Sequence, residues 1–482
     1  MSFFNLISSQ DDPEFFTLTL REKSSYLRDI LRDSLPQIMT FLTPFLTIII
    51  DINFISKYQD SPLISAFLLA ATFCTALIYS WISSYNQAAT LYISQASGAK
   101  DFDGCARYFR RNLIILGVTL IPLTVTLLLA GKLMAFFGVN EEITSIARRF
   151  TKLSIIPMIG FALFDSLKAF VIGQNIFKPV LYIQLSHLLF HFICSIILIN
   201  TLKLGIIGAV LCRIFTEWTN LALLYVYIKK SGQFIQTWGV WSSDIFDISK
   251  LWKQFKWSYS VGIIRYGQLV FYQILNFLAY KFSPEQVLTH IAITQVASIH
   301  FALALGISVT MQIFMGNGLG ERSINKAKNY IWAGFIALVI ETIVYGALLW
   351  YAMGILTEFW NDKKGSRDYM RGTLVIYMST CMLVDGINNG IIAVLKAVGK
   401  ERITGLNVLG STYVLGGFFV AIFAFYFDLK VKGIWIGFGT AFLIQFAMNL
   451  NNFRKIDWQE VSKNIMNKNR QIQGETELTD SL

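Results

Sequence analysis

The same loop-and-helix text occurs twice in this chain, about 222 residues apart, and both copies lie among long apolar segments. Residues 95–102 read QASGAKDF, and residues 317–321 answer with NGLGE. Further on, LGIIG at 204–208 is answered by GIWIG at 433–437. Because the copies follow in the same order with nearly the same offset, each half holds an even number of spans. The repeat predicts two like halves, related by an axis along the membrane normal.

Composition places this chain in the membrane. Hydrophobic residues make up 54% of it and charged residues 15%, and its mean hydropathy is +0.53. A soluble domain of this length would need more polar surface than that. Twelve stretches reach the length of about 20 residues that spans a bilayer: 35–56, 62–94, 112–137, 149–173, 179–200, 205–229, 256–281, 286–316, 327–354, 371–396, 405–427 and 432–453. We therefore predict an all-α membrane protein of twelve transmembrane helices, arranged as two six-helix lobes related by a parallel pseudo-two-fold repeat.

The spans divide the chain into five predicted parts. They are a cytoplasmic N-terminal segment (1–33), an N-lobe with helices 1–6 (34–229), a cytoplasmic connection (230–255), a C-lobe with helices 7–12 (256–455) and a cytoplasmic tail (456–482). Lys and Arg gather in one set of loops, which predicts that both termini face the cytoplasm. The formal charge of +11 then reflects topology and contact with anionic lipid, so we expect the lipid bilayer and no nucleic acid as a partner.

Several motifs together resemble the multidrug and toxic compound extrusion (MATE) family. SQASGAKD at 94–101 is similar to the family's SQAxGAGD loop, and MGNGLG at 315–320 resembles its VGNxLGAG loop. KGIWIG at 432–437 is close to the family's KGLWIG, and LKAVGK at 395–400 resembles its LRGxGxQ text. The resemblance covers about residues 30–455, in order and with the family's spacing. It implies a secondary transporter in which two lobes enclose a central cavity.

The seventh span departs from the family pattern. Eukaryotic members usually carry glutamates there, inside an EWWxFE text, whereas this chain has Gln268 and Gln273 at those positions. A glutamine cannot release a proton, so the carboxylate that would couple transport in the C-lobe is missing or moved.

Asp51 heads the candidates for cation coupling, because ionisable groups at membrane depth are usually functional. The resemblance makes it the cation-responsive carboxylate of the N-lobe. His187, His191 and Ser195 share one face of the fifth span, and His191 falls where the family commonly has an asparagine facing that carboxylate. We expect Asp51, His191 and Ser195 to lie together. A zinc site from His187, His191 and Cys194 is an alternative, but the sequence nominates no fourth ligand and we predict no metal.

In the C-lobe, Asp385 matches the family's tenth-span aspartate and completes the predicted coupling residues. Arg265 is its expected ion-pair partner, unless that side chain reaches the cytoplasmic interface instead. Glu341 in the ninth span has no evident partner, and Arg213 and Glu217 are expected to form an intrahelical pair. The substrate cavity is predicted to be lined by Arg265, Gln268, Tyr272, Gln273, Asn388 and Asn389.

These observations favour a secondary active antiporter that exports organic, positively charged compounds, driven by a proton or a sodium ion and without a further cofactor. Neither a Walker A text nor a hydrolase motif is present, so we expect no enzyme activity. A lipid-linked saccharide flippase of the related superfamily, or a membrane-embedded enzyme or scaffold, are the alternatives. We expect a multi-pass protein of the plasma membrane or of a vacuolar or other organelle membrane, acting as a monomer on a small organic substrate.

Overall fold

The computed structural model describes residues 20–57, 61–136, 139–239, 241, 243–360 and 364–461. These residues form α-helices with short π-helical and 3-10 segments, and no strand occurs among them. They divide into two compact units. The N-terminal unit consists of Met39–Ser97 and Asp101–Tyr266, and the C-terminal unit of the described residues within Met1–Ile38, Gly98–Lys100 and Gly267–Leu482. The outer parts of the two predicted cytoplasmic ends, 1–19 and 462–482, lie outside the described residues.

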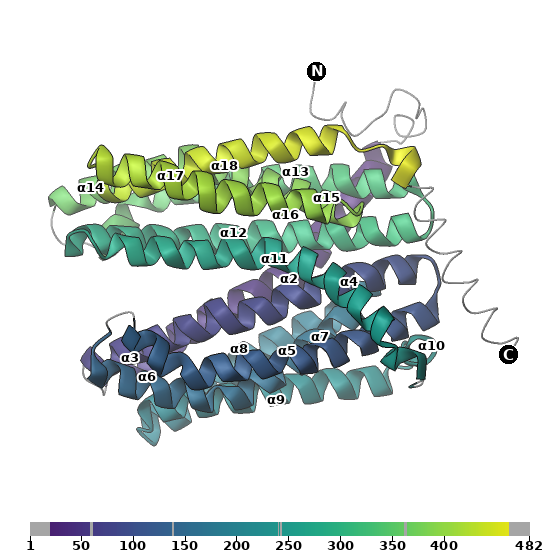
Figure 1. Cartoon of the computed structure of the whole chain (residues 1–482), viewed down its shortest axis with the longest axis horizontal. Helices are drawn as coiled ribbons and strands as arrows, with labels where there is room; N and C mark the ends of the chain where they lie inside the picture. Colours follow the sequence, from purple (N-terminus) through teal and green to yellow (C-terminus); the bar gives the residue numbers. More distant parts are fainter. Residues whose placement is uncertain are drawn as a thin grey trace, which may run out of the picture. The chain divides into compact units, whose positions relative to one another are not determined.

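The helices of the N-terminal unit are long and packed closely along their lengths. Figure 1 shows α5, α7, α8 and α9 running beside one another. The core between them is apolar and includes Phe67, Phe150 and Ile78, with the rings of Phe67 and Phe150 in an edge-to-face contact. The elements are α3 (Ser61–Phe73), η2 (Cys74–Tyr79), α4 (Ser80–Gly98), α5 (Phe102–Phe136), α6 (Glu141–Leu153), α7 (Ile155–Gly173), α8 (Lys178–Ser195), η3 (Ile196–Thr201), α9 (Gly205–Lys230), α10 (Ile235–Trp238) and η4 (Ser243–Phe246).

The C-terminal unit is built around α12, which packs on α13 and α15, while α15 also packs on α18. Its core gathers aromatic side chains, with Trp435, Phe438 and Tyr377 at the centre. The elements are α12 (Pro284–Gly320), α13 (Ile324–Trp360), α14 (Lys364–Tyr377), η5 (Met378–Met382), α15 (Leu383–Ala397), α16 (Glu401–Leu409), η6 (Gly410–Leu415), α17 (Gly416–Val420), η7 (Ala421–Tyr426) and α18 (Lys430–Arg454). Helices α2 (Leu20–Ile55) and α11 (Ile248–Ala279) contribute residues to both units.

Eleven helical segments of the described residues are long and apolar enough to cross a membrane. The remaining predicted span corresponds to α11, which has 32 residues but is less apolar because it carries Arg265, Gln268 and Gln273. With α11 the twelve predicted helices are present, in the predicted order. Most helices extend beyond the predicted apolar stretches, because a helix continues past the hydrocarbon into the polar layer.

The fourth span begins later than predicted. We expected it to start at residue 149, but the chain forms a separate amphipathic helix, α6, that ends at Leu153, and the spanning helix α7 starts at Ile155. The side chain of Asn140 caps α6 by accepting a hydrogen bond from the backbone N–H of Glu142. Because α6 carries charged residues on one face, it is suited to a membrane surface and not to its interior.

Two π-helical segments stand directly beside the polar positions that the sequence nominated. In the N-terminal unit, η3 starts at Ile196, one residue after Ser195. In the C-terminal unit, η5 ends at Met382, three residues before Asp385. Such wide turns insert one extra residue into a helix and occur frequently at functional sites. They therefore direct attention to the ends of α8 and α15.

The two copies of the repeated loop meet in the C-terminal unit. A Cβ atom added at Gly98 would lie 2.0 Å from the backbone oxygen of Asn317, so only glycine permits this approach. Gly98 belongs to the first copy of the loop and Asn317 to the second.

Candidate functional site

A buried carboxylate near the end of α2 is the centre of the first candidate site. Asp51 is fully enclosed, and its Oδ1 atom lies 3.0 Å from Nε2 of His191. The hydroxyl of Ser195 donates a hydrogen bond of 3.2 Å to the same oxygen. His191 and Ser195 come from one face of α8, as their spacing of four residues predicted. The structure thus brings together the three N-lobe residues that we expected to meet.

Arg213 of α9 adds a positive charge to this site. Its Nε atom lies 3.9 Å from Oδ2 of Asp51, the carboxylate oxygen that accepts no hydrogen bond from the described residues. The predicted intrahelical pair with Glu217 is not a close ion pair, although the charge of Arg213 still acts on Glu217. Spacing alone could not find this contact, because it depends on how α9 turns toward α2 and α8.

His191 retains one free ring position. An ionised carboxylate can only accept hydrogen bonds, so Nε2 carries the hydrogen that points at Asp51. The other ring nitrogen, Nδ1, is buried and makes no hydrogen bond with the described residues. The pair thus has two buried polar atoms, Nδ1 of His191 and Oδ2 of Asp51, without a hydrogen bond from the described residues.

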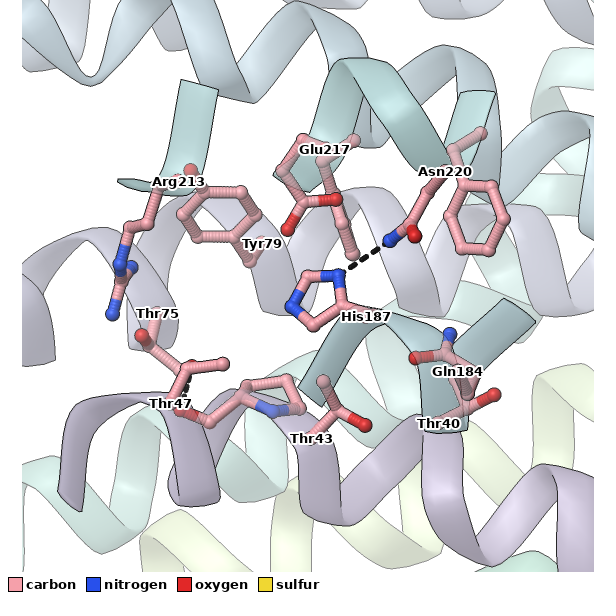
Figure 2. Close-up of a pocket in the computed structure, with 13 residues that line it drawn as sticks. Thr40, Thr43, Thr47, Thr75, Tyr79, Gln184, His187, Arg213, Glu217 and Asn220 are labelled. Carbon is pink, nitrogen blue, oxygen red and sulfur yellow. Dashed lines mark hydrogen bonds between the residues drawn. The ribbon is translucent and has the colours of Figure 1, made fainter. Parts of the chain in front are cut away.

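A cavity of about 40 Å³, lined by both apolar and polar side chains, opens within the same unit. Figure 2 shows threonines of α2 on one side of it, with Glu217 and Asn220 of α9 opposite and His187 of α8 between them. A cavity needs about 10–15 Å³ to hold a water molecule, so water fits here, whereas a drug-sized ligand needs several hundred. Its lining consists of Thr40, Thr43, Pro44, Thr47, Thr75, Tyr79, Phe161, Phe164, Gln184, His187, Arg213, Glu217 and Asn220.

His187 faces this cavity and does not share the environment of His191. Its Nδ1 atom lies 2.5 Å from the amide nitrogen of Asn220 and accepts the hydrogen that this amide donates. The two imidazole rings are stacked with centroids 6.0 Å apart. Among the residues that the structure describes, no group of three His, Cys, Asp or Glu side chains is arranged to hold a metal ion. The alternative of a site from His187, His191 and Cys194 therefore receives no support.

The second candidate site lies in the C-terminal unit and contains a residue that we did not predict. His300 of α12 is fully buried between two carboxylates. Its Nδ1 atom lies 3.4 Å from Oδ2 of Asp385 on α15, and its Nε2 atom lies 3.5 Å from Oε2 of Glu341 on α13. Glu341, for which the sequence offered no partner, thus belongs to a cluster with His300 and Asp385. The rule for ionisable groups at membrane depth could have found His300, because it lies inside the predicted span 286–316.

The expected pair of Arg265 and Asp385 is replaced by two separate environments. Asp385 faces His300 and accepts a hydrogen bond of 2.8 Å from the side chain of Asn389 on the next helical turn. The guanidinium of Arg265 stands over the ring of Phe41, 4.4 Å from its centroid, where a cation is attracted to the aromatic face. Within the C-terminal unit, a histidine therefore faces the aspartate, while Arg265 belongs to the N-terminal unit.

The other predicted cavity residues of the C-terminal unit take part in local polar contacts. Asn388 donates to Gln445 over 3.2 Å and accepts from Asn449 over 3.1 Å, both on α18. Gln273 accepts a hydrogen bond of 3.2 Å from Asn276. Tyr272 packs its ring edge-to-face on Phe438, and Gln268 is buried. That these residues line the substrate cavity remains a prediction.

A buried polar network on α4, α5 and α7 was also missed. Asp165 accepts a hydrogen bond of 2.8 Å from Asn86 and forms an ion pair with Lys168. Asn86 in turn accepts from Asn112 over 2.8 Å and from Ser166 over 3.0 Å. The signals in the sequence were Asp165 and Lys168, two opposite charges three residues apart in one predicted span, each of which requires a partner. Apart from Oδ1 of Asn112, which has no partner among the described residues, the named side chains satisfy one another, so we regard the network as structural.

Comparison with known proteins agrees with both the fold and the repeat. A family model described as MatE matches residues 36–197 and 263–422, one segment in each half. Protein DETOXIFICATION 16 of Arabidopsis thaliana is 24% identical over 469 residues, which cover 93% of this chain and 92% of that protein. Protein DETOXIFICATION 37 of the same plant is 24% identical over 392 residues, or 80% of this chain and 77% of its own length.

Solved structures show the same architecture. The crystal structure of the eukaryotic MATE transporter AtDTX14 matches with a TM-score of 0.86 at 17% identity, over 92% of this chain and 99% of that one. A MOP superfamily transporter from Pyrococcus furiosus matches with a TM-score of 0.77 at 16% identity, over 91% and 96%. The multi-pass helical fold, the repeated motifs and the extent of the family match lead to one conclusion. This chain belongs to the MatE family of multidrug and toxic compound extrusion transporters.

Proposed function

We propose that this transporter is a proton-driven antiporter that exports organic, positively charged compounds. The observation that carries the proposal is the enclosed contact of 3.0 Å between Asp51 and His191, with Arg213 beside them. A proton that enters from outside is taken up by this pair, and its release to the cytoplasm completes the cycle. The two lobes alternate between outward-open and inward-open states, and the proton and the substrate occupy the transporter at different stages.

The composition of the Asp51 site favours a proton over a sodium ion. Hard cations prefer a shell of oxygen ligands, but one neighbour of this carboxylate is an imidazole nitrogen and another is a guanidinium. A metal cation placed beside Oδ2 would meet the positive charge of Arg213 at short range. A proton avoids this conflict, because imidazole and carboxylate can share it through their existing hydrogen bond.

The proposed substrate class rests on the relatives, and the charges of the cavity lining argue against the alternative. The Arabidopsis relatives carry the name detoxification, which supports export of organic compounds. A flippase of lipid-linked sugars would favour a strongly cationic cavity. The cavity of the N-terminal unit instead contains one arginine, Arg213, and one glutamate, Glu217.

The experiment uses the full chain in proteoliposomes loaded with ethidium as a fluorescent organic cation. A proton gradient and a sodium gradient are imposed in turn, with the membrane potential clamped. We expect efflux that responds to the proton gradient and is unchanged by sodium. Efflux that follows sodium alone would overturn the choice of ion, and absence of gradient-driven efflux for several organic cations would overturn the proposed substrate class.

A further inference from the structure

The cluster of His300, Glu341 and Asp385 has an unbalanced charge. Two carboxylates face the two nitrogens of one imidazole, so an imidazolium can compensate only one of them. The side chains of Glu341 and Asp385 are 9% and 11% exposed, and His300 is fully enclosed. A surplus negative charge is costly in such surroundings. The cluster therefore favours one additional proton.

The contacts within the cluster are too long to be settled hydrogen bonds. Distances of 3.4 and 3.5 Å exceed the range of about 2.7–3.2 Å that N–H···O bonds prefer. Neither ring nitrogen of His300 meets the geometry of a hydrogen bond with the described residues. Three buried polar groups are thus close together but are not held by well-formed hydrogen bonds. The cluster can therefore gain and lose a proton without breaking such bonds.

Glu341 is the less stabilised of the two carboxylates. Asp385 already accepts a hydrogen bond from Asn389 through Oδ1. Oε1 of Glu341 has no partner among the described residues, and its Oε2 has only His300 and a contact of 3.4 Å from the hydroxyl of Thr342. The proton goes to the carboxylate whose charge is less well solvated by hydrogen bonds.

The other titratable groups around the cluster are neutral side chains. The ring of Tyr345 of α13 lies tilted against that of His300, with centroids 5.3 Å apart, and its hydroxyl donates to the backbone oxygen of Val296. Asp385 interacts electrostatically with Tyr272 of α11, Tyr377 of α14 and Cys381 of η5. None of these side chains supplies a second positive charge.

We propose that His300, Glu341 and Asp385 form a second proton-binding site, in which Glu341 supplies the carboxylate that α11 lacks. In the loaded state an O–H bond forms on Glu341, while His300 remains an imidazolium and Asp385 a carboxylate. In the empty state that O–H bond breaks and the proton leaves, with no other bond changed. This proposal rests on the proposed proton-driven transport, because it gives the C-terminal unit a part in the same coupling.

Infrared difference spectroscopy of the purified full chain in lipid nanodiscs tests the site without transport. The pH is lowered from about 8 to about 6, a range in which histidine–carboxylate clusters exchange protons. We expect a carbonyl band of a protonated carboxylic acid to appear in the wild type and to shift when all glutamates carry ¹³C in the carboxyl group. This label identifies the band as that of a glutamic acid, and a Glu217→Gln protein, which leaves the C-terminal unit unchanged, excludes the other glutamate that lines a cavity.

Three variants sharpen the result. Glu341→Gln should lose the glutamic acid band, whereas Glu358→Gln, on the same helix but with an exposed side chain, should keep it. The chain has only four histidines, so His300→Gln assigns the His300 signal in ¹⁵N spectra, and we expect that signal to be an imidazolium. A band that ignores the glutamate label, survives in Glu341→Gln or changes on addition of sodium would overturn the proposal, as would a neutral His300.

Failure of this inference and failure of the proposed function can be told apart. If ethidium efflux follows the proton gradient but the glutamic acid band is absent, only the second site is wrong. If the band is present but efflux follows sodium, the site binds a proton and the proposed coupling ion is wrong.

Discussion

The two units of this transporter each hold a buried cluster of ionisable groups, and the two clusters have opposite compositions. In the N-terminal unit, one carboxylate, Asp51, faces an imidazole and a guanidinium. In the C-terminal unit, one imidazole, His300, faces two carboxylates. Counted with neutral His191 and charged His300, the first cluster is balanced and the second has one surplus negative charge. The two halves thus share the arrangement of their helices but differ in the charged side chains that the helices carry.

This difference shows that the absence of a family motif does not mean that its charge is absent from the site. The two glutamines of α11, Gln268 and Gln273, suggested that the C-terminal unit had lost its coupling carboxylate. Glu341 lies on α13 and faces the same histidine as Asp385. Glu341 lies elsewhere in the sequence than the family's glutamates but still belongs to the cluster. The charges around Asp385 therefore tell more about the site than the match to the motif does.

The largest effect is expected from Asp51→Asn. The change removes the only carboxylate of the N-terminal cluster, so proton-driven ethidium efflux should fall to that of empty liposomes. It also leaves Arg213 without its counter-charge, which can cost about 3–5 kcal/mol of stability, so the folded yield must be measured by gel filtration. Asp428→Asn, an exposed aspartate between η7 and α18, is the matched control and should transport normally. Full coupled efflux by the folded Asp51→Asn protein would remove the N-terminal cluster from the mechanism.

Glu341→Gln should change the coupling ratio and not abolish transport. If each cluster carries a proton, the variant should move about one proton fewer for each ethidium exported. The ratio is obtained from parallel measurements of proton and ethidium flux. Glu358→Gln serves as the control on the same helix. A ratio equal to that of the wild type would mean that the two units are unequal in coupling as well as in charge.

His191→Asn should keep transport but shift the pH profile of efflux. The amide can still donate a hydrogen bond to Asp51, but it cannot carry a proton, so the pair no longer titrates as a unit. His187→Asn should leave the profile unchanged, since His187 is engaged with Asn220. Efflux is measured as a function of external pH for all three proteins. Superimposable profiles for the wild type and His191→Asn would make His191 a packing residue.

Gln268→Ala tests the substrate side of the comparison and should have a modest effect. It removes one uncharged hydrogen-bonding group, worth about 0.5–1.5 kcal/mol, so the ethidium concentration for half-maximal efflux should rise about two- to twelvefold. The proton-to-ethidium ratio should stay unchanged. A changed ratio would mean that this glutamine contributes to coupling after all.

The smallest effect concerns Asp244, outside the membrane spans. Burial raises the pKa of this carboxyl, but the hydrogen bond from Lys250 and the charge of Arg111 outweigh it and hold the pKa below 3.8. A depressed carboxyl pKa stabilises the fold above the unfolded value, and that stabilisation is lost as the pH falls below it. The side chain is 37% exposed, so we expect less than about 1 kcal/mol. Thermal unfolding of the wild type and Asp244→Asn should differ slightly at pH 6 and converge in acid.

The sequence predicted what depends on periodicity and spacing. The repeat and the apolar stretches predicted twelve helices in two halves, and the four-residue spacing placed His191 and Ser195 on one face. Contacts between distant helices followed only where the family resemblance supplied them, as for Asp51 with His191 and Ser195. His300, Glu341 and Asp385 lie on three helices, and nothing in their local text links them. Arg213 and Glu217 had the spacing of an intrahelical pair, but packing of α9 against α2 and α8 turned the arginine toward Asp51 instead.

The π-helical segment η5 gives the cluster at His300 a local reserve of chain length. One residue advances an α-helix by about 100°, since a turn holds 3.6 residues. Deleting a single residue within Met378–Met382 would let this stretch relax to a regular α-helix, so that α14 stays in place and Asp385 keeps its present facing. Deleting a single residue from the regular turn between η5 and Asp385 has no such reserve, and would turn Asp385 by about 100° away from His300. The same loss of one residue is thus absorbed in η5 and disruptive a few positions later.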